Sequence, residues 1–301
     1  MNSNRIRSQR LIPIIGFCIV LLFTLIAYQF GWTGSLNFDD EPNLNGLYGV
    51  SDLPSAIGFT ASGEAGPTGR PIALLSFAAQ HASWPDPAPF LIVNTLIHLV
   101  NAILVFILIK QLSFGFFEDR FRSWLPLLVA SIWVVSPFLA PSSLVVVQRM
   151  TGISALFLLL TLTIYLAYRP YYRGTLRSDI KIAAILGIGG LAAGFSKENG
   201  FLLPIFVLLI ERLITPKWSS QMGPLSRRAM ICFLILPTVA ILAYLVIRGF
   251  SSSSFIFRDY TAGERLLTQF RVLVFYIKQL LLPSVQSVTP FYDAWVPSRG
   301  L

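Results

Sequence analysis

Two adjacent carboxylates, Asp39 and Asp40, stand in the segment SLNFDDEPNL, just beyond the first long apolar run of the chain. A carboxylate beside an acceptor hydroxyl can remove its proton as a general base, which typically contributes about 10²–10⁴-fold to a rate. A second acid next to it can position the first acid or the substrate, and repulsion within the pair raises one pKa. The alternative is a solvated loop at the exit of a membrane helix.

Several cations also stand next to apolar runs. Gln148 and Arg149 lie in VVVQRMTG, Lys197 and Glu198 in GFSKENGF, and Arg70 in GRPIALLSF. Arginine suits bidentate contact with phosphate and lysine suits a point contact. These residues therefore predict an anion site at the outer membrane face. The alternatives are that Arg149 snorkels to the membrane surface, and that Lys197 and Glu198 pair with each other at their turn.

Polar side chains also interrupt the apolar run PFLIVNTLIHLVNAILVFILIK. Asn94, His98 and Asn101 are spaced i, i+4 and i+7, so they share one face of a helix. Such residues seldom face lipid. They indicate either hydrogen bonds between helices or the lining of an aqueous substrate cavity, and both interpretations stay open here.

Metal and cofactor chemistry has little support in the sequence. The two histidines, His81 and His98, have no partner at ligand spacing, and no Walker loop, GxGxxG or GxSxG occurs. The acidic cluster that ends at Glu41 could hold Mg²⁺ only with substrate phosphates as further ligands. We therefore expect no metal and no cofactor. Cys18 and Cys232 lie in apolar runs and are predicted to be small buried hydrophobes.

The composition indicates what must position these residues. The chain has 301 residues, of which 54% are hydrophobic and 12% charged, whereas soluble domains average about 25% charged. This predicts an all-α polytopic membrane protein with about eight transmembrane helices. The last helix, which carries Arg271 and Lys278, is alternatively an amphipathic interfacial helix. The helices are expected near residues 11–32, 89–112, 125–147, 150–168, 181–196, 200–214, 229–248 and 267–283.

Charge gives the expected orientation. The net charge of +9 reflects basic residues concentrated in short loops, which favours membrane topology over nucleic-acid binding. Most of these residues fall on one side, so the N-terminus is predicted to be cytoplasmic. A long loop, residues 33–88, is then outside. It is rich in Gly, Pro, Ser and Asp, contains the acidic pair, and has no apolar run that we assign to a helix. Loops of this length without regular structure are usually either functional or disordered.

The ordered motifs carry a family resemblance. FDD follows the first span, GRP precedes the second, NxxxHxxN lies within it, VQRM begins a later span and SKENG forms a helix–helix turn. This order resembles the GT-C superfamily of membrane glycosyltransferases. It is most similar to transmembrane protein O-mannosyltransferases, which have TPR repeats in animals, and to their bacterial relatives, including enzymes that put arabinofuranose on type IV pilins. The tail from Arg265 to Leu301 is also similar to the bacterial members.

The resemblance implies a single GT-C-like transmembrane domain over residues 1–301 and an inverting transfer from a polyprenyl-phosphate sugar. The catalytic acid of the family lies in the first outer loop, where Asp39 matches the first acid and Asp40 the second. Arg149 falls on the QR element and Lys197–Glu198 on the SKE element. The implied setting is the bacterial inner membrane with a periplasmic site, and the implied acceptor is a pilin or other protein hydroxyl, or a glycan. Family members have further spans after the tail motif, so we expect a chain that is C-terminally incomplete.

Two other classes of function remain as alternatives. A flippase or transporter for a lipid-linked sugar would use the intramembrane His98 and Asn101 to line its pathway. However, a long acidic outer loop is not needed for transport, and no inverted repeat is visible in the sequence. The third class is a non-catalytic membrane component of a glycosylation pathway.

Overall fold

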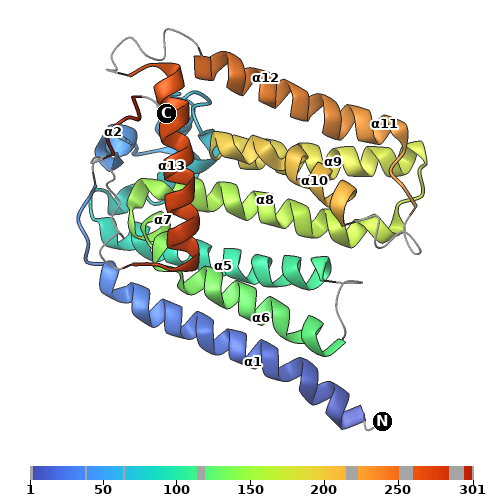
Figure 1. Cartoon of the computed structure of the whole chain (residues 1–301). Helices are drawn as coiled ribbons and strands as arrows, with labels where there is room; N and C mark the ends of the chain where they lie inside the picture. Colours follow the sequence, from blue (N-terminus) through green and yellow to red (C-terminus); the bar gives the residue numbers. More distant parts are fainter. Residues whose placement is uncertain are drawn as a thin grey trace.

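A computed structural model describes residues 3–37, 39–63, 65–113, 119–214, 223–250, 260–284 and 295–299. The side chains of residues 3–10, 119–120 and 249 lie outside this description. Among the basic residues that the charge pattern assigns to the cytoplasmic side, this applies to the side chains of Arg5, Arg7, Arg10 and Arg120, and Lys217 lies outside the described residues altogether. Within the described ranges every regular element is helical (Figure 1).

The described long helices run side by side for most of the chain (Figure 1). They are α1 (Ser3–Tyr28), α5 (Pro87–Leu112), α6 (Asp119–Val135), α8 (Arg149–Tyr168), α9 (Leu176–Gly194) and α12 (Leu236–Phe250), and a further long helix, α13 (Ala262–Leu281), crosses them. The shorter ones are α2 (Asp40–Leu44), α3 (Leu53–Thr60), α4 (Pro71–Ala78), α7 (Pro141–Leu144), α10 (Leu203–Leu213) and α11 (Arg227–Ala229). Short 3₁₀ segments that matter for the site are η5 (Val146–Gln148) and η7 (Glu198–Leu202). Helix α5 packs against both α8 and α6, α8 packs against α9, and α1 packs against α6.

Four of these helical stretches are long and apolar enough to cross a membrane. They are Leu11–Gly31, Pro87–Leu112, Val146–Tyr171 and Arg227–Arg248. A fifth span is formed if Phe121–Val135 and Pro137–Leu144, which are bent by 52° at their junction, are counted together. The described chain is therefore an all-helical protein of the membrane-spanning type.

Of the about eight spans expected, the described residues contain four, or five with the bent pair. The stretch predicted at 181–196 is part of α9, whose first turns carry Arg177, Asp179 and Lys181 and so leave too few apolar residues. The stretch predicted at 200–214 contains α10, which has 11 residues and is therefore about 16 Å long. A hydrocarbon core of about 30 Å needs nearly twice that length.

The last described helix, α13, runs across the other long helices (Figure 1). It does not qualify as a span, and Arg271 on it contacts the backbone carbonyl of Val296, the hydroxyl of Ser298 and the ring of Trp295. This arrangement favours the interfacial interpretation over an eighth span.

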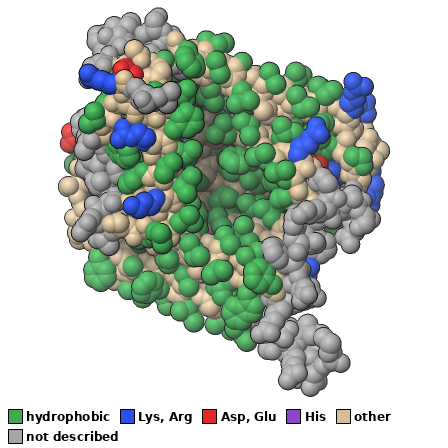
Figure 2. All heavy atoms as spheres, in the orientation of Figure 1, with side chains coloured by type: hydrophobic (Ala, Val, Ile, Leu, Met, Phe, Trp, Pro, Cys, Tyr) green, Lys and Arg blue, Asp and Glu red, His purple; other side chains and the backbone are tan. Residues whose placement is uncertain are grey.

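Charged side chains lie toward both ends of the long helices, and hydrophobic side chains cover the middle of the face in Figure 2. We call the end that carries residues 33–86 the acidic-loop end, and the end that carries the N-terminus the opposite end. Cys18 and Cys232 are exposed on their helices. The prediction that they are buried was wrong, because apolar helix faces in this protein also point outward, where lipid would cover them.

Residues 33–88 are largely helical, contrary to the sequence interpretation. Helices α2, α3 and α4 lie in this segment, and Asp52 begins α3 with a capping box that includes Ser55. Their apolar residues form a cluster with the start of α5 and with residues 145–150. Leu44, Phe77 and Phe90 in this cluster are completely buried. The segment is thus a small packed unit that can hold side chains in fixed positions.

Candidate functional site

Asp40 is a buried anchor of the acidic segment. Its side chain is inaccessible to solvent, and its two oxygens accept hydrogen bonds from the backbone N–H groups of Asn37 and Val147, both at 2.7 Å. Val147 belongs to η5, immediately before α8, so Asp40 ties the first loop to the start of a later span. Because both oxygens are occupied, Asp40 acts as a structural residue in this arrangement.

Burial raises the pKa of Asp40 above the ordinary value for aspartate. The hydrogen bonds from Asn37 and Val147 act in the opposite direction, and the charge of Asp39 adds to the increase. Repulsion within the acidic pair, which the sequence predicted as a cause, is therefore present but smaller than the effect of burial.

Asp39 differs from its neighbour in both exposure and bonding. It is exposed at the start of α2, and its backbone carbonyl accepts a hydrogen bond from the Asn43 side chain at 2.7 Å. Within the described part of the chain its carboxylate makes no hydrogen bond. Asp39 is thus an accessible carboxylate held beside a buried one, and a base must be accessible to an incoming hydroxyl.

Lys197 stands on the turn between α9 and η7. Its ammonium donates to the hydroxyl of Thr151 at 2.6 Å and to Oε1 of Gln148 at 3.4 Å. Burial, followed by the charge of Arg70, lowers the pKa of Lys197, while the charges of Glu198 and Asp39 act to raise it. Asp39 is thus one of the charges that act on the ammonium of Lys197. The contacts of Lys197 are to neutral groups, so its positive charge is available for an anion.

Arg70 and Glu198 form an ion pair at the same end. Nη2 of Arg70 lies 2.9 Å from Oε2 of Glu198, and Nε donates to both carboxylate oxygens at 3.1 and 3.2 Å. The hydroxyl of Thr68 also donates to Glu198. Burial raises the pKa of Glu198, but the hydrogen bonds and charge of Arg70, with smaller backbone and Thr68 contributions, bring it below its usual value. The alternative of an internal Lys197–Glu198 pair is thus not what forms, because Glu198 pairs with Arg70.

The backbone of Arg70 makes this pairing possible. Arg70 adopts a left-handed conformation with φ of 47°, immediately before Pro71 begins α4. A non-glycine residue in this region is unusual and needs support from its surroundings. Gly66 provides room, since a Cβ at that position would come within 2.8 Å of the Arg70 guanidinium. The sharp turn directs the guanidinium toward Glu198.

Arg149 is a buried clamp. It is 1% exposed, and its guanidinium donates to the side chain of Asn94 at 2.8 Å and to the backbone carbonyls of Ser76 and Phe90 at 3.1 and 3.0 Å. The ring of Phe77 lies 4.5 Å from its charge centre. A guanidinium with three protein acceptors, buried in this way, neither snorkels to the surface nor offers itself to a phosphate. We therefore interpret Arg149 as a structural residue.

The polar stripe of α5 joins neighbouring helices. Asn94 donates to the carbonyls of Val145 and Val146, and Asn101 donates to the carbonyl of Gly152 at 2.9 Å. His98 bonds through Nε2 to the carbonyl of Val134 at 3.0 Å and lies between the rings of Tyr28 and Trp133. These are the hydrogen bonds between helices that one interpretation predicted.

The same stripe also lines a cavity of about 140 Å³. Asn94, His98, Asn101, Arg149 and Thr151 are among its lining residues. Oδ1 of Asn101 is buried and has no hydrogen-bond partner. The cavity is smaller than the roughly 300–1,000 Å³ of common ligand pockets, so it is suited to water rather than to a sugar.

Two contributors to the site were missed in the sequence. Thr151 connects Lys197 to Gln148, whose Oε1 accepts from the threonine hydroxyl at 2.7 Å. Thr68 supports the carboxylate of Glu198. Thr151 could have been found, because it lies three residues after Gln148 and such residues share a helix face. The described residues hold no group of three or more His, Cys, Asp and Glu able to bind a metal ion.

Comparison with known proteins adds no relative. No family model matches the chain, and neither the curated proteins nor the solved structures yield a match. The site therefore stands on its own geometry: an exposed Asp39, a buried Asp40 that anchors it, a half-buried Lys197 and an Arg70–Glu198 ion pair.

Proposed function

We propose that this protein is a membrane glycosyltransferase that moves a sugar from a polyprenyl phosphate to a hydroxyl of a protein or glycan. A pilin Ser or Thr is one such acceptor. The reaction is inverting and takes place at the acidic-loop end, which we assign to the periplasmic face of a bacterial inner membrane. The proposal combines the ordered motifs of the sequence with the chemistry of the site.

One observation carries the proposal: segments far apart in the sequence meet at one end of the helices. Asp40 contacts Val147, Lys197 contacts Thr151, and Arg70 contacts Glu198. The segment with the accessible carboxylate and the lysine with neutral contacts therefore both meet the junction of η5 and α8. A base and a phosphate-binding cation, held beside an apolar bundle, are what transfer from a lipid phosphate requires.

Each residue of the site has a separate role in the proposed reaction. Asp39 accepts the proton of the acceptor hydroxyl while the hydroxyl oxygen forms a bond to the anomeric carbon. The bond from that carbon to the phosphate oxygen breaks, and the electron pair leaves with the polyprenyl phosphate. Lys197 stabilises the charge that develops on this leaving group. Asp40 and the Arg70–Glu198 pair are positioning groups.

A flippase remains the second candidate, and the cavity beneath the site bears on it. A pathway for a lipid-linked sugar along the α5 stripe would need a passage, yet the cavity there is about 140 Å³, and His98 and Asn101 are hydrogen-bonded to Val134 and Gly152 of neighbouring helices. The packing of the stripe therefore favours the transferase.

The test uses the purified full chain in lipid vesicles with a radiolabelled polyprenyl-phosphate sugar and an acceptor peptide that contains Ser and Thr. Label on the peptide supports the transferase. Movement of the donor across the vesicle membrane without peptide labelling supports the flippase and rejects our proposal. Asp52→Asn is a matched control, because Asp52 is another exposed acid of the same segment, and asparagine also caps a helix. This variant is expected to keep full transfer.

A further inference from the structure

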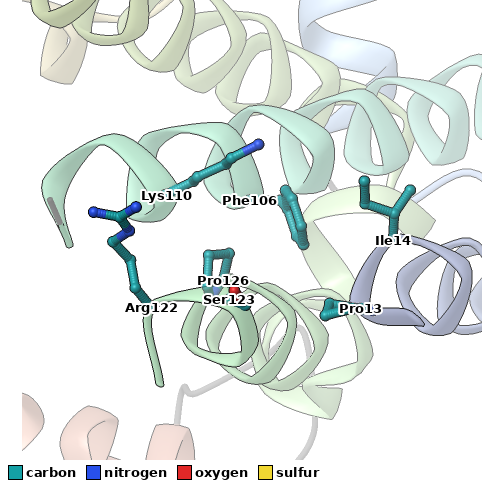
Figure 3. Close-up of a pocket in the computed structure, with 7 residues that line it drawn as sticks. All are labelled: Pro13, Ile14, Phe106, Lys110, Arg122, Ser123 and Pro126. Carbon is teal, nitrogen blue, oxygen red and sulfur yellow. The ribbon is translucent and has the colours of Figure 1, made fainter. Parts of the chain in front are cut away.

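The opposite end of the molecule holds a second pocket, far along the helices from the acidic segment. It has a volume of about 330 Å³ and lies between α1, α5 and α6 (Figure 3). Its lining includes two cations, one hydroxyl and several apolar groups: Lys110, Arg122, Ser123, Ile14, Phe106 and Pro126. The proposed transferase mechanism uses none of these residues.

The pocket has a gradient of polarity along its depth. On α5, Phe106 lies four residues before Lys110, and on α6, Pro126 lies four residues after Arg122. Residues four apart share a helix face and are separated by about 6 Å along the axis. Because α5 ends where α6 begins, both helices place a cation at the end of the bundle and an apolar residue one turn deeper. Figure 3 shows Lys110 and Arg122 on facing helices.

The depth of the pocket matches the border of the apolar band. Lys110 lies two residues before the end of the span Pro87–Leu112, and Arg122 lies one residue after the start of the stretch Phe121–Val135. Ile14 lies three residues inside the span that begins at Leu11. The cations are therefore at the level where spans end and phospholipid headgroups lie.

We propose that this pocket binds the headgroup of an anionic phospholipid, with its phosphate between Lys110 and Arg122. Arginine can contact two phosphate oxygens and lysine a third. The glycerol and first methylenes lie against Phe106, Ile14 and Pro126. A free phosphate would leave this apolar wall without a partner, whereas a phospholipid matches both halves of the pocket. Basic pockets between membrane helices are known to suit anionic headgroups.

A lipid in this position would join three helices. Helix α1 packs mainly against α6, and α6 packs against α5. A headgroup held by α5 and α6, with Ile14 of α1 at its side, adds a link among all three at their common end. Bound lipid is therefore expected to stabilise the fold, because a ligand that binds only the native state raises its stability. This expectation does not depend on the transferase proposal.

The experiment measures binding of phosphatidylglycerol to the full chain purified in detergent, by native mass spectrometry and by the shift in thermal unfolding midpoint. Phosphatidylcholine and inorganic phosphate serve as separate arms. We expect phosphatidylglycerol to be retained and to raise the midpoint, with little effect from the other two. The double variant Lys110→Gln with Arg122→Gln should bind phosphatidylglycerol about 30-fold more weakly, because each of the two basic residues near the membrane surface contributes a similar share of the binding free energy.

The matched control is Arg173→Gln with Arg177→Gln. It also removes two exposed cations from the opposite end, but outside the pocket. The proposal is overturned if this control weakens binding as much, or if inorganic phosphate alone shifts the midpoint as far. If the Lys110 and Arg122 variant does not fold, a photoactivatable phosphatidylglycerol is used on the unaltered chain. Crosslinks must then concentrate in residues 13–14, 106–110 and 122–126, and an even spread over the helices contradicts the site.

Discussion

Asp39 and Asp40 are neighbours in sequence and are expected to respond in opposite ways to substitution. The carboxylate of Asp39 is exposed and makes no hydrogen bond within the described residues. Asp39→Asn should therefore leave the unfolding midpoint of the purified protein unchanged. Transfer should fall by at least about 100-fold, because asparagine cannot accept the proton of the acceptor. Such a loss corresponds to about 2.7 kcal/mol in the activation free energy.

Asp40→Ala should instead act through stability. The substitution removes two hydrogen bonds of 2.7 Å to a carboxylate with no solvent exposure. Hydrogen bonds to charged groups contribute about 1.5–3 kcal/mol each, so the sum is about 3–6 kcal/mol. Burial of the carboxylate, which also raises the pKa of Asp40, offsets part of this sum. We therefore expect a loss of about 3 kcal/mol in the free energy of unfolding.

The assay combines two measurements on each variant: labelled-sugar transfer per folded molecule, and thermal unfolding followed by tryptophan fluorescence. Transfer that survives in Asp39→Asn refutes its role as base, whatever the stability shows. A stable Asp40→Ala protein with no transfer would reverse the roles of the two acids. Only a stable, inactive Asp39 variant beside an unstable Asp40 variant agrees with the geometry.

Three further outcomes follow from the contacts of charged residues. Burial lowers the pKa of Lys197 below 10.5, so the ammonium loses its proton at a lower pH than free lysine does, and transfer should decline at that pH. Lys197→Arg should move this alkaline decline of the pH–rate profile to higher pH. A decline that stays at the same pH would exclude Lys197 as the titrating group. Arg149→Lys should lower the free energy of unfolding by at least about 2 kcal/mol, measured by chemical denaturation, since an ammonium cannot reach three acceptors on separate elements; full stability with weakened donor binding would mean that Arg149 serves the phosphate after all. Glu211→Ala leaves the buried guanidinium of Arg169 without the carboxylate that lies 2.8 Å away, which should lower the free energy of unfolding by about 3–5 kcal/mol. Arg228→Gln, at an exposed arginine, is the control, and equal losses of stability in the two variants would contradict the burial argument.

The sequence predicted helices well where the evidence is a sum over many residues. Hydropathy summed over twenty residues predicted spans near residues 11–32, 89–112 and 229–248, where the structure has helices long and apolar enough to cross a membrane. It failed at α10, where the apolar run is long enough to suggest a span but the helix has 11 residues. Hydropathy counts residues and does not report where a turn such as SKENG ends and a helix begins. The short helices of residues 33–88 were missed for a related reason, because they are stabilised by packing more than by local pattern.

The candidate site shows the same limit at the level of contacts. Residue types and order brought attention to Asp39, Arg70, Arg149 and Lys197, and the described structure gathers the segments that carry them. The sequence did not predict which charged or polar groups these side chains would contact. Glu198 pairs with Arg70 instead of its neighbour Lys197 because Arg70 adopts a left-handed backbone beside Gly66. Burial of Arg149 depends on acceptors from Ser76, Asn94 and Phe90, which no local sequence pattern specifies.

The hydrogen bond between Asp40 and Val147 also has a consequence for biosynthesis. It joins residues 107 positions apart, and the acidic segment leaves the ribosome well before its partner. At synthesis rates of about 5–20 residues per second, the segment waits for seconds without the backbone N–H that holds it. The site can therefore mature only after α8 has been inserted beside α5. Chaperones or proteases that bind nascent membrane proteins would therefore encounter this segment before it is anchored. The chain becomes able to form the site only when Val147 binds Asp40.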